Sequence, residues 1–444
     1  MPSNEEEELL SRVGPGTPSG EVFRRYWLPI EVAVNLGGGR GPSYSGTNNP
    51  LRTTILGEHL VLFRDGSGKP GLVEEHCSHR GTSLYHGRVE EDGLRCMYHG
   101  WKYDRSGQCI DTPAEPPDSN FKHTVRHPAY PCREVGGLIF AYMGPPELEP
   151  PFPRFPQLFR EDGVRVTGNG KRIQNSNVFL QTLDNVLDVW HREVAHGWFK
   201  GEPRVGAIHH GRDGLPQTPI KYERTPWGAC YATLQNTNQP AVYEYHETHA
   251  VLPCLRMGQP GGSNINWAVP IDDYNTRWFG VSFHPYDANG ELPEDLYKRM
   301  NNQTPTDSGG PFYEGWFEDV GHWWNYGHPL RQGPIWEDEA IMSTQGPEER
   351  HRLPNWERWR LATSDRGVMI MHDLWREQVE RVQQGLDPVG IVRGEAAEQY
   401  IAIPGDLRFV DREAGQRLFD RTLEERVSQR EQAISVRVRQ AVRA

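Results

Sequence analysis

The sequence lacks any long hydrophobic run. None of the apolar stretches in the 444 residues approaches the roughly 20 residues that a membrane-spanning helix needs. The first ten residues, "MPSNEEEELL", are acidic, whereas a signal peptide begins with basic residues followed by an apolar stretch. We therefore expect a cytoplasmic protein without a membrane partner.

Clusters of positive charge and abundant cysteine are also missing. The chain has 48 Lys and Arg against 60 Asp and Glu, a formal charge of -12, and its basic residues are scattered. Such a distribution argues against nucleic acid or an anionic membrane as the main partner. Six cysteines in a chain of this length are too few for a disulfide scaffold, so paired cysteines indicate metal or redox chemistry.

The length and the pattern of the sequence predict two domains. After a helical candidate at "GEVFRRYWLPI" (20–30), residues 30–145 form short β-type runs between Gly, Pro and Asn turns. The proline-rich segment "GPPELEPPFPRFP" (144–156) is the best linker, so we expect domains over 1–150 and 151–444.

The second half of the chain mixes helical and strand patterns. We expect a helix over 177–196, strands over 228–237, 242–252 and 276–285, and a largely helical region from Glu337 that ends in a charged amphipathic helix pair. Strands followed by flanking helices predict an α+β fold.

The segment "CSHRGTSLYHGRVEEDGLRCMYHGW" contains Cys77, His79, Cys96 and His99. A chance match to C-x-H followed by C-x-x-H at this spacing is expected about 4 times in 10,000 such chains. Structural zinc sites usually pair like ligands, whereas here each loop offers one thiol and one imidazole. This arrangement predicts a Rieske [2Fe–2S] cluster, with Cys77 and Cys96 on one iron and His79 and His99 on the other.

A second set of candidate ligands lies in "LDVWHREVAHGW", which contains Asp188, His191 and His196. This motif is weak by itself, because three polar residues on a half-exposed helix would give the same pattern. His191 and His196 differ by about 140° around an ideal helix. Both can bind one metal only if the helix ends or distorts between them, and Gly197 is a candidate helix breaker.

The Rieske motif favours the interpretation of this second set as a metal site, because a cluster that delivers single electrons needs an acceptor for them. Two histidines and one carboxylate with open positions are typical of non-haem Fe(II) oxygenases. For the carboxylate we choose Asp338, from the acidic run in "GPIWEDEAIMSTQG". The alternative is that this run only complements a helix dipole. Asp188 could be a ligand, could orient His191, or could accept a hydrogen bond from a Rieske histidine.

At these residues the chain resembles the catalytic (alpha) subunits of Rieske non-haem iron ring-hydroxylating oxygenases, most closely the phthalate 4,5-dioxygenase-like group. The resemblance implies a Rieske domain joined to a helix-grip catalytic domain with an antiparallel sheet and flanking helices. It implies that His191, His196 and Asp338 hold a mononuclear Fe(II). It also implies that Asp188 links this site to His99 of a neighbouring subunit, in a homotrimer or homohexamer.

The function implied is that of a terminal oxygenase component in aromatic catabolism, which uses O₂ to cis-dihydroxylate an aromatic carboxylate. Electrons are expected from a separate NAD(P)H-dependent flavin and iron–sulfur reductase, with or without a ferredoxin. Indeed "NLGGGRGPSYSG" has proline at the sixth position of the G-x-G-x-x-G motif for dinucleotides. The alternatives are a monooxygenase that dealkylates or cleaves aryl ethers, and a non-catalytic Rieske electron carrier.

Overall fold

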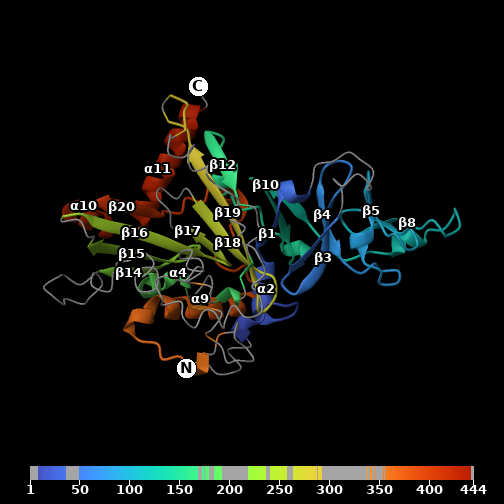
Figure 1. Ribbon diagram of the computed structural model, residues 1–444, viewed down its shortest axis with the longest axis horizontal. Helices are drawn as coiled ribbons and strands as arrows, with labels where there is room; N and C mark the ends of the chain where they lie inside the picture. Colours follow the sequence, from blue (N-terminus) through green and yellow to red (C-terminus); the bar gives the residue numbers. More distant parts are fainter. Residues whose placement is uncertain are drawn as a thin grey trace, which may run out of the picture.

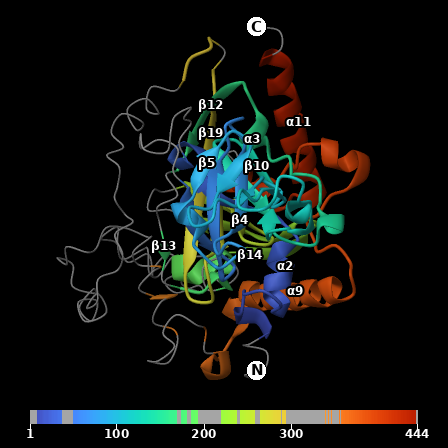
Figure 2. The same cartoon turned by 90° about the vertical axis from the view of Figure 1, so that its right-hand side faces the viewer.

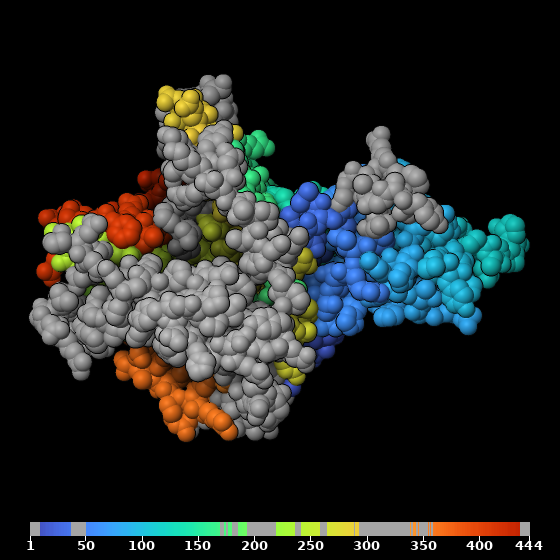
Figure 3. Space-filling view, in the orientation of Figure 1, coloured from blue at the N-terminus to red at the C-terminus, as the bar shows by residue number. Residues whose placement is uncertain are grey.

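The structure is a computed structural model that shows two β-rich regions side by side (Figure 1). It describes residues 9–36, 50–168, 173–174, 176–179, 185–192, 219–236, 241–257, 264–287, 289–292, 338, 341–342, 345, 354 and 356–441. Figure 3 shows the residues between about 50 and 130, coloured blue to cyan, projecting to one side of the rest of the molecule.

The described chain begins with helix α2 (Pro18–Arg24). Thr17 caps this helix by accepting a hydrogen bond from the backbone N–H of Gly20, and proline stands at its first position. The predicted helix over 20–30 is correct only up to Arg24, because strand β1 (Trp27–Val32) follows. Every residue of β1 is buried, and the strand pairs with β11 (Leu138–Tyr142).

Three antiparallel sheets form the N-terminal region, where the sequence predicts short strands. The first has the order β1-β11-β10, with β10 at Cys132–Val135. The second contains β2 (Leu51–Ile55), β3 (Glu58–Arg64), β4 (Pro70–Glu74) and β9 (Ala129–Tyr130). The third contains β5 (Arg88–Glu90), β6 (Gly93–Arg95), β7 (Lys102–Tyr103) and β8 (Cys109–Asp111). A small core that includes Phe63, Leu94 and Tyr103 fills the space beside Cys77 and Cys96.

A nine-stranded antiparallel sheet dominates the rest of the molecule. Its order is β12-β19-β18-β17-β16-β15-β14, while β13 pairs with β19 and β20 pairs with β16. The strands are β12 (Gly163–Thr167), β13 (Ile173–Gln174), β14 (Ile220–Thr225), β15 (Gly228–Asn236), β16 (Tyr243–Val251), β17 (Leu255–Met257), β18 (Asn264–Pro270), β19 (Thr276–Pro285) and β20 (Asp406–Val410). The three strands expected at 228–237, 242–252 and 276–285 are therefore confirmed.

Helices cover both faces of this sheet. Helices α4 (Asn185–Leu187) and α9 (Arg366–Gln383) lie on one face, and α10 (Arg412–Phe419) and α11 (Leu423–Ala441) lie on the other (Figures 1 and 2). We call these the inner and the outer face. The expected C-terminal helix pair is confirmed, but the region after Glu337 is not helical throughout, because β20 returns to pair with β16.

Short helical turns connect these elements. They are α3 (Pro156–Phe159) and the 3-10 helices Ala33–Leu36, Leu84–His86, Phe121–Thr124, Pro146–Leu148, Trp356–Arg358, Thr363–Asp365 and Gly394–Glu398. The domain boundary near residue 150 stays a prediction. Within the described part of the chain, no helix combines the length and the apolar character that crossing a membrane requires.

Candidate active site

The four predicted Rieske ligands lie on two loops with the same backbone geometry. In the first loop the N–H of Gly81 donates to Cys77 O at 2.8 Å, and in the second the N–H of Gly100 donates to Cys96 O at 3.1 Å. Both glycines have left-handed backbone angles, with φ of 74° and 76°. A side chain there would be strained, so each glycine lets its loop turn tightly beside the cysteine.

The loops bring like ligands together. The Cys77 and Cys96 side chains share a hydrogen bond and are buried, while the rings of His79 and His99 lie 4.5 Å apart between centroids. Trp101 stacks on His79 with an interplanar angle of 8°. Two buried thiols beside two half-exposed imidazoles are the donor set of a Rieske cluster, so the residues fit that cofactor.

The electrostatics of the thiols also suit an iron pair. The hydrogen bond between them lowers the pKa of Cys77 and raises that of Cys96. Tyr103 Oη lies 3.2 Å from Cys77 Sγ. The N–H groups of Tyr98 and His99 point toward Cys96 and lower its pKa in part. These polar contacts would stabilise thiolate ligands.

Asp188 interrupts the helix that the sequence predicts over 177–196. Its Oδ1 accepts hydrogen bonds from the backbone N–H groups of Trp190 at 2.9 Å and His191 at 3.2 Å. It therefore caps a new helical segment, and α4 ends just before it. Burial alone would raise the pKa of Asp188, but the His191 ring and the two capping N–H groups lower it below the ordinary value.

His191 lies between two carboxylates. Its Nδ1 is 3.6 Å from Asp188 Oδ2, and its Nε2 is 3.6 Å from Asp338 Oδ1. The Asn185 side-chain amide donates to the same oxygen of Asp338 at 3.2 Å, one helical turn before Asp188. An imidazole nitrogen and a carboxylate oxygen that face each other, both mostly buried, fit a mononuclear iron.

The predicted iron ligand His196 lies outside the described residues.

The inner face of the sheet opposite α4 carries buried polar groups. Arg192, next to His191 in sequence, contacts the ring of His246 on β16 and lies 3.4 Å from Glu244 Oε1. On β15, Thr233 and Gln235 pair with His246 and Glu244. Among the described residues, Thr233 Oγ1 and Gln235 Nε2 are buried without a hydrogen-bond partner. These two groups are available to a polar ligand atom.

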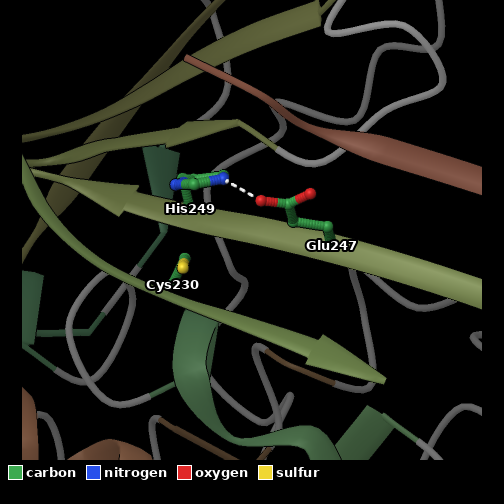
Figure 4. Close-up of side chains that lie close together, drawn as sticks. All are labelled: Cys230, Glu247 and His249. Atoms are coloured by element: carbon green, nitrogen blue, oxygen red, sulfur yellow. Dashed lines mark hydrogen bonds and ion pairs between the residues drawn. The ribbon is translucent and has the colours of Figure 1, made fainter. Parts of the chain in front are cut away.

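A different group of possible metal ligands lies on the outer face. Cys230, Glu247 and His249 lie close together on β15 and β16 (Figure 4), and this is the one such group found among the described residues. His249 Nε2 lies 2.8 Å from Glu247 Oε1, and Arg426 Nη1 lies 3.1 Å from the same oxygen. Because an arginine already neutralises Glu247, the group is better explained as a buried ion-pair network than as a metal site.

Comparisons with known proteins identify the family of the chain. A family model described as the Rieske [2Fe-2S] domain matches residues 42–131. The alpha subunit of phenoxybenzoate dioxygenase from Ectopseudomonas oleovorans is 31% identical over 87% of this chain and 88% of its own length. The chain belongs to the Rieske non-haem iron ring-hydroxylating oxygenases. The oxygenase subunit of 5,5'-dehydrodivanillate O-demethylase from Sphingobium is 31% identical over 91% of this chain and 87% of its own.

A solved structure has a similar fold. The structure of dicamba monooxygenase bound to dicamba has a TM-score of 0.55 and covers 82% of this chain and 99% of that chain, at 16% identity. The expected combination of a Rieske domain with an antiparallel catalytic sheet and flanking helices is confirmed. This Rieske oxygenase therefore uses a [2Fe–2S] cluster and a mononuclear iron.

Because the chain belongs to an oxygenase family, the alternative of a non-catalytic Rieske electron carrier is excluded. The chain is the oxygenase component of a multicomponent system, and its electrons come from separate reductase or ferredoxin proteins. Sequence patterns did not predict that Tyr103 lies at the Rieske loops. They also did not predict that Asn185 and Arg192 lie at the candidate iron site. For Asn185 the spacing of one helical turn before Asp188 was an available signal.

Proposed function

We propose that this oxygenase cis-dihydroxylates a small aromatic carboxylate, with iron held by His191, His196 and Asp338. The observation that carries the proposal is the facing pair of His191 Nε2 and Asp338 Oδ1 beside a polar sheet wall. The names of the relatives support the substrate class, since one acts on a phenoxybenzoate.

The bound iron would supply the activation of O₂, and the chain's own residues would orient the substrate and exclude water. Asn185 positions Asp338 through its amide, while Asp188 and the backbone it caps hold His191 in place. Thr233 and Gln235 would bind the polar group of the substrate. Because Arg192 is already paired with Glu244, it supports this wall rather than adding a free positive charge.

We further propose that Asp188 connects the iron site to His99 of a neighbouring subunit, in a head-to-tail trimer. Strands β5 to β8, which flank the second ligand loop, lie well away from α4 (Figure 1). Electrons would therefore cross between subunits rather than within one chain.

A mixing experiment tests the electron path. One variant, Cys77→Ser with Cys96→Ser, lacks the cluster, and another, His191→Ala, lacks the iron site. Each should be inactive alone, whereas co-expressed subunits should regain turnover with a surrogate reductase. Sedimentation of the wild type should report a trimer or hexamer. A mixture as inactive as its parents would refute electron transfer between subunits.

Asp188→Asn tests the connecting carboxylate itself. We expect both metal centres to remain, and single turnover from the reduced cluster to slow by roughly 10–100-fold. Asp184→Asn offers a matched control four residues earlier in the sequence. Wild-type single turnover in Asp188→Asn would exclude the connecting role.

The second candidate is a monooxygenase that removes an O-methyl group, as the O-demethylase relative does. Product analysis separates the two functions. Benzoates and methoxybenzoates are incubated with O₂ labelled with ¹⁸O, and the products are identified by mass spectrometry. Two labelled oxygens in one ring product support dihydroxylation, whereas a phenol with release of formaldehyde supports demethylation.

A further inference from the structure

A buried histidine lies beside the Rieske site without belonging to either ligand loop. His127 comes from the segment just before strand β9 and is 1% exposed. Its Nδ1 lies 2.7 Å from Ser78 Oγ, and its Nε2 lies 2.8 Å from Glu74 O. Ser78 stands in the first ligand loop, between Cys77 and His79. Because Glu74 is the last residue of β4, the imidazole ties this loop to the neighbouring sheet.

Hydrogen bonds fix the orientation of the His127 ring. A backbone carbonyl can only accept, so the Nε2–H group of His127 donates to Glu74 O. In the neutral ring, Nδ1 then accepts from the Ser78 hydroxyl. The backbone N–H of His127 also donates to Gly107 O at 2.7 Å. A side chain held at both ring nitrogens and at its own N–H cannot turn without breaking these bonds.

The ring of Tyr103 packs on this imidazole, with centroids 4.6 Å apart and an interplanar angle of 31°. The Tyr103 hydroxyl in turn lies 3.2 Å from Cys77 Sγ. Strand β7, which carries Tyr103, has two residues, and its register with β8 shifts between Lys102 and Tyr103. Since so short a strand makes few ladder hydrogen bonds, side-chain packing has to place the phenol. His127 is a packing partner that hydrogen bonds hold in place through both ring nitrogens.

The position of the phenol matters because its hydroxyl reaches a candidate cluster ligand. A hydrogen bond to a ligand sulfur stabilises the reduced cluster more than the oxidised one, and so raises the reduction potential. The strength of a hydrogen bond falls steeply as its distance and angle leave the optimum. A residue that fixes the Tyr103 ring therefore influences the reduction potential without supplying a ligand.

We propose that His127 is a positioning residue of the Rieske site that helps to set the reduction potential of the cluster. Ser78 and the Glu74 carbonyl hold the imidazole, and the imidazole holds the Tyr103 hydroxyl toward Cys77 Sγ. The inference depends on the Rieske site alone. It therefore stands whichever substrate the oxygenase accepts and whichever path the electrons take between subunits.

Redox titration of the holoenzyme carrying His127→Leu, followed by circular dichroism, tests the proposal. The four ligands are unchanged, so the iron and sulfide content of the cluster should equal that of the wild type. At the wild-type midpoint potential, the ratio of reduced to oxidised cluster should fall by roughly threefold to tenfold, because the hydrogen bond to sulfur is weakened. His59→Leu is the matched control, since the exposed His59 ring also lies beside a hydroxyl, 3.2 Å from Thr54 Oγ1. It should keep the wild-type potential.

Combination with Tyr103→Phe separates positioning from a general loss of structure. If His127 acts through the Tyr103 hydroxyl, adding His127→Leu to Tyr103→Phe should not change the reduction potential further. A wild-type potential in His127→Leu alone would overturn the proposal. So would a shift of the same size with and without the Tyr103 hydroxyl.

Ser78→Ala decides the case in which His127→Leu fails to assemble the cluster. This variant keeps the imidazole and removes one of its two side-chain anchors. It should lower the reduction potential by less than Tyr103→Phe does, and it should cause no further shift when combined with Tyr103→Phe. An unchanged potential in Ser78→Ala, or the same shift in both backgrounds, would overturn the proposal in that case.

Discussion

The two metal sites of this oxygenase are built in opposite ways. The Rieske loops repeat one backbone pattern, in which a cysteine carbonyl accepts from a left-handed glycine four residues later. The proposed iron site joins His191 on a short helical segment to Asp338, far along the chain. The first kind of site is defined by local sequence, whereas the second exists only when distant segments pack together.

This difference extends to the supporting contacts. At the Rieske loops, Arg95 donates to Gly100 O at 2.5 Å and pairs with Glu90. The residues that stabilise the loop therefore come from the same small sheet. At the proposed iron site the stabilising contact is made by Asn185, which donates to Asp338 across a long sequence separation. A change in the first region should stay local, while a change in the second should alter iron binding.

The strongest test of this separation is His191→Ala. We expect turnover to fall at least about a hundredfold and iron content to fall from about three to about two per chain. The visible spectrum of the cluster should remain, because the Rieske loops do not contact this histidine. The exposed His123→Ala variant serves as the control. Loss of the cluster spectrum in His191→Ala would show that the two sites depend on each other.

A smaller effect is expected for Asn185→Ala. The Asp338 carboxylate would lose the amide that orients it, and iron affinity should fall about tenfold. Chelator competition with iron quantification measures this change, and added Fe(II) should restore turnover. Asn120→Ala, at an exposed position, should leave iron affinity unchanged. If Asn185→Ala also retained full affinity, Asp338 would not need this support.

On the Rieske side, Tyr103→Phe should lower the reduction potential of the cluster. The Tyr103 hydroxyl lies 3.2 Å from Cys77 Sγ, and a hydrogen bond to sulfur stabilises the reduced cluster more than the oxidised one. Loss of one such bond corresponds to roughly 50 mV. Redox titration followed by circular dichroism measures the shift, with Tyr85→Phe as the control. A reduction potential equal to that of the wild type would show that the Tyr103 hydroxyl does not affect the cluster.

The smallest effect concerns the stability of the Rieske loops. The hydrogen bond from Arg95 lowers the pKa of Glu90 to about 2. A depressed carboxyl pKa contributes stability above the unfolded value of about 4.3, and that contribution is lost as the pH falls toward 2. Glu90→Gln should reduce the free energy of unfolding by about 1 kcal/mol at pH 7 after screening, and by about half as much at pH 3.

Urea unfolding followed at the cluster absorbance measures this difference, with the exposed Glu413→Gln as control. A difference that stayed constant between pH 7 and pH 3 would mean that the charge of Glu90 is not responsible.

Much of the fold could be predicted from hydrophobic periodicity. The strands over 228–237, 242–252 and 276–285 and the C-terminal helix pair were found in this way. The helix expected over 20–30 continues into β1 because its second half pairs with β11, a contact made far along the chain. Strand β20 was missed for the same reason, since its partner β16 is remote.

The sequence by itself determined the candidate Rieske ligands, because a cysteine, a histidine and a glycine at fixed spacing form each loop locally. It also determined that His191 was a candidate ligand, but not which oxygen would face it. Only the tertiary structure decided that Asp338 lies 3.6 Å from His191 Nε2, that Asn185 supports it, and that Glu247 pairs with Arg426. These contacts join segments far apart in the chain, and their partners are selected by packing, which local spacing does not encode.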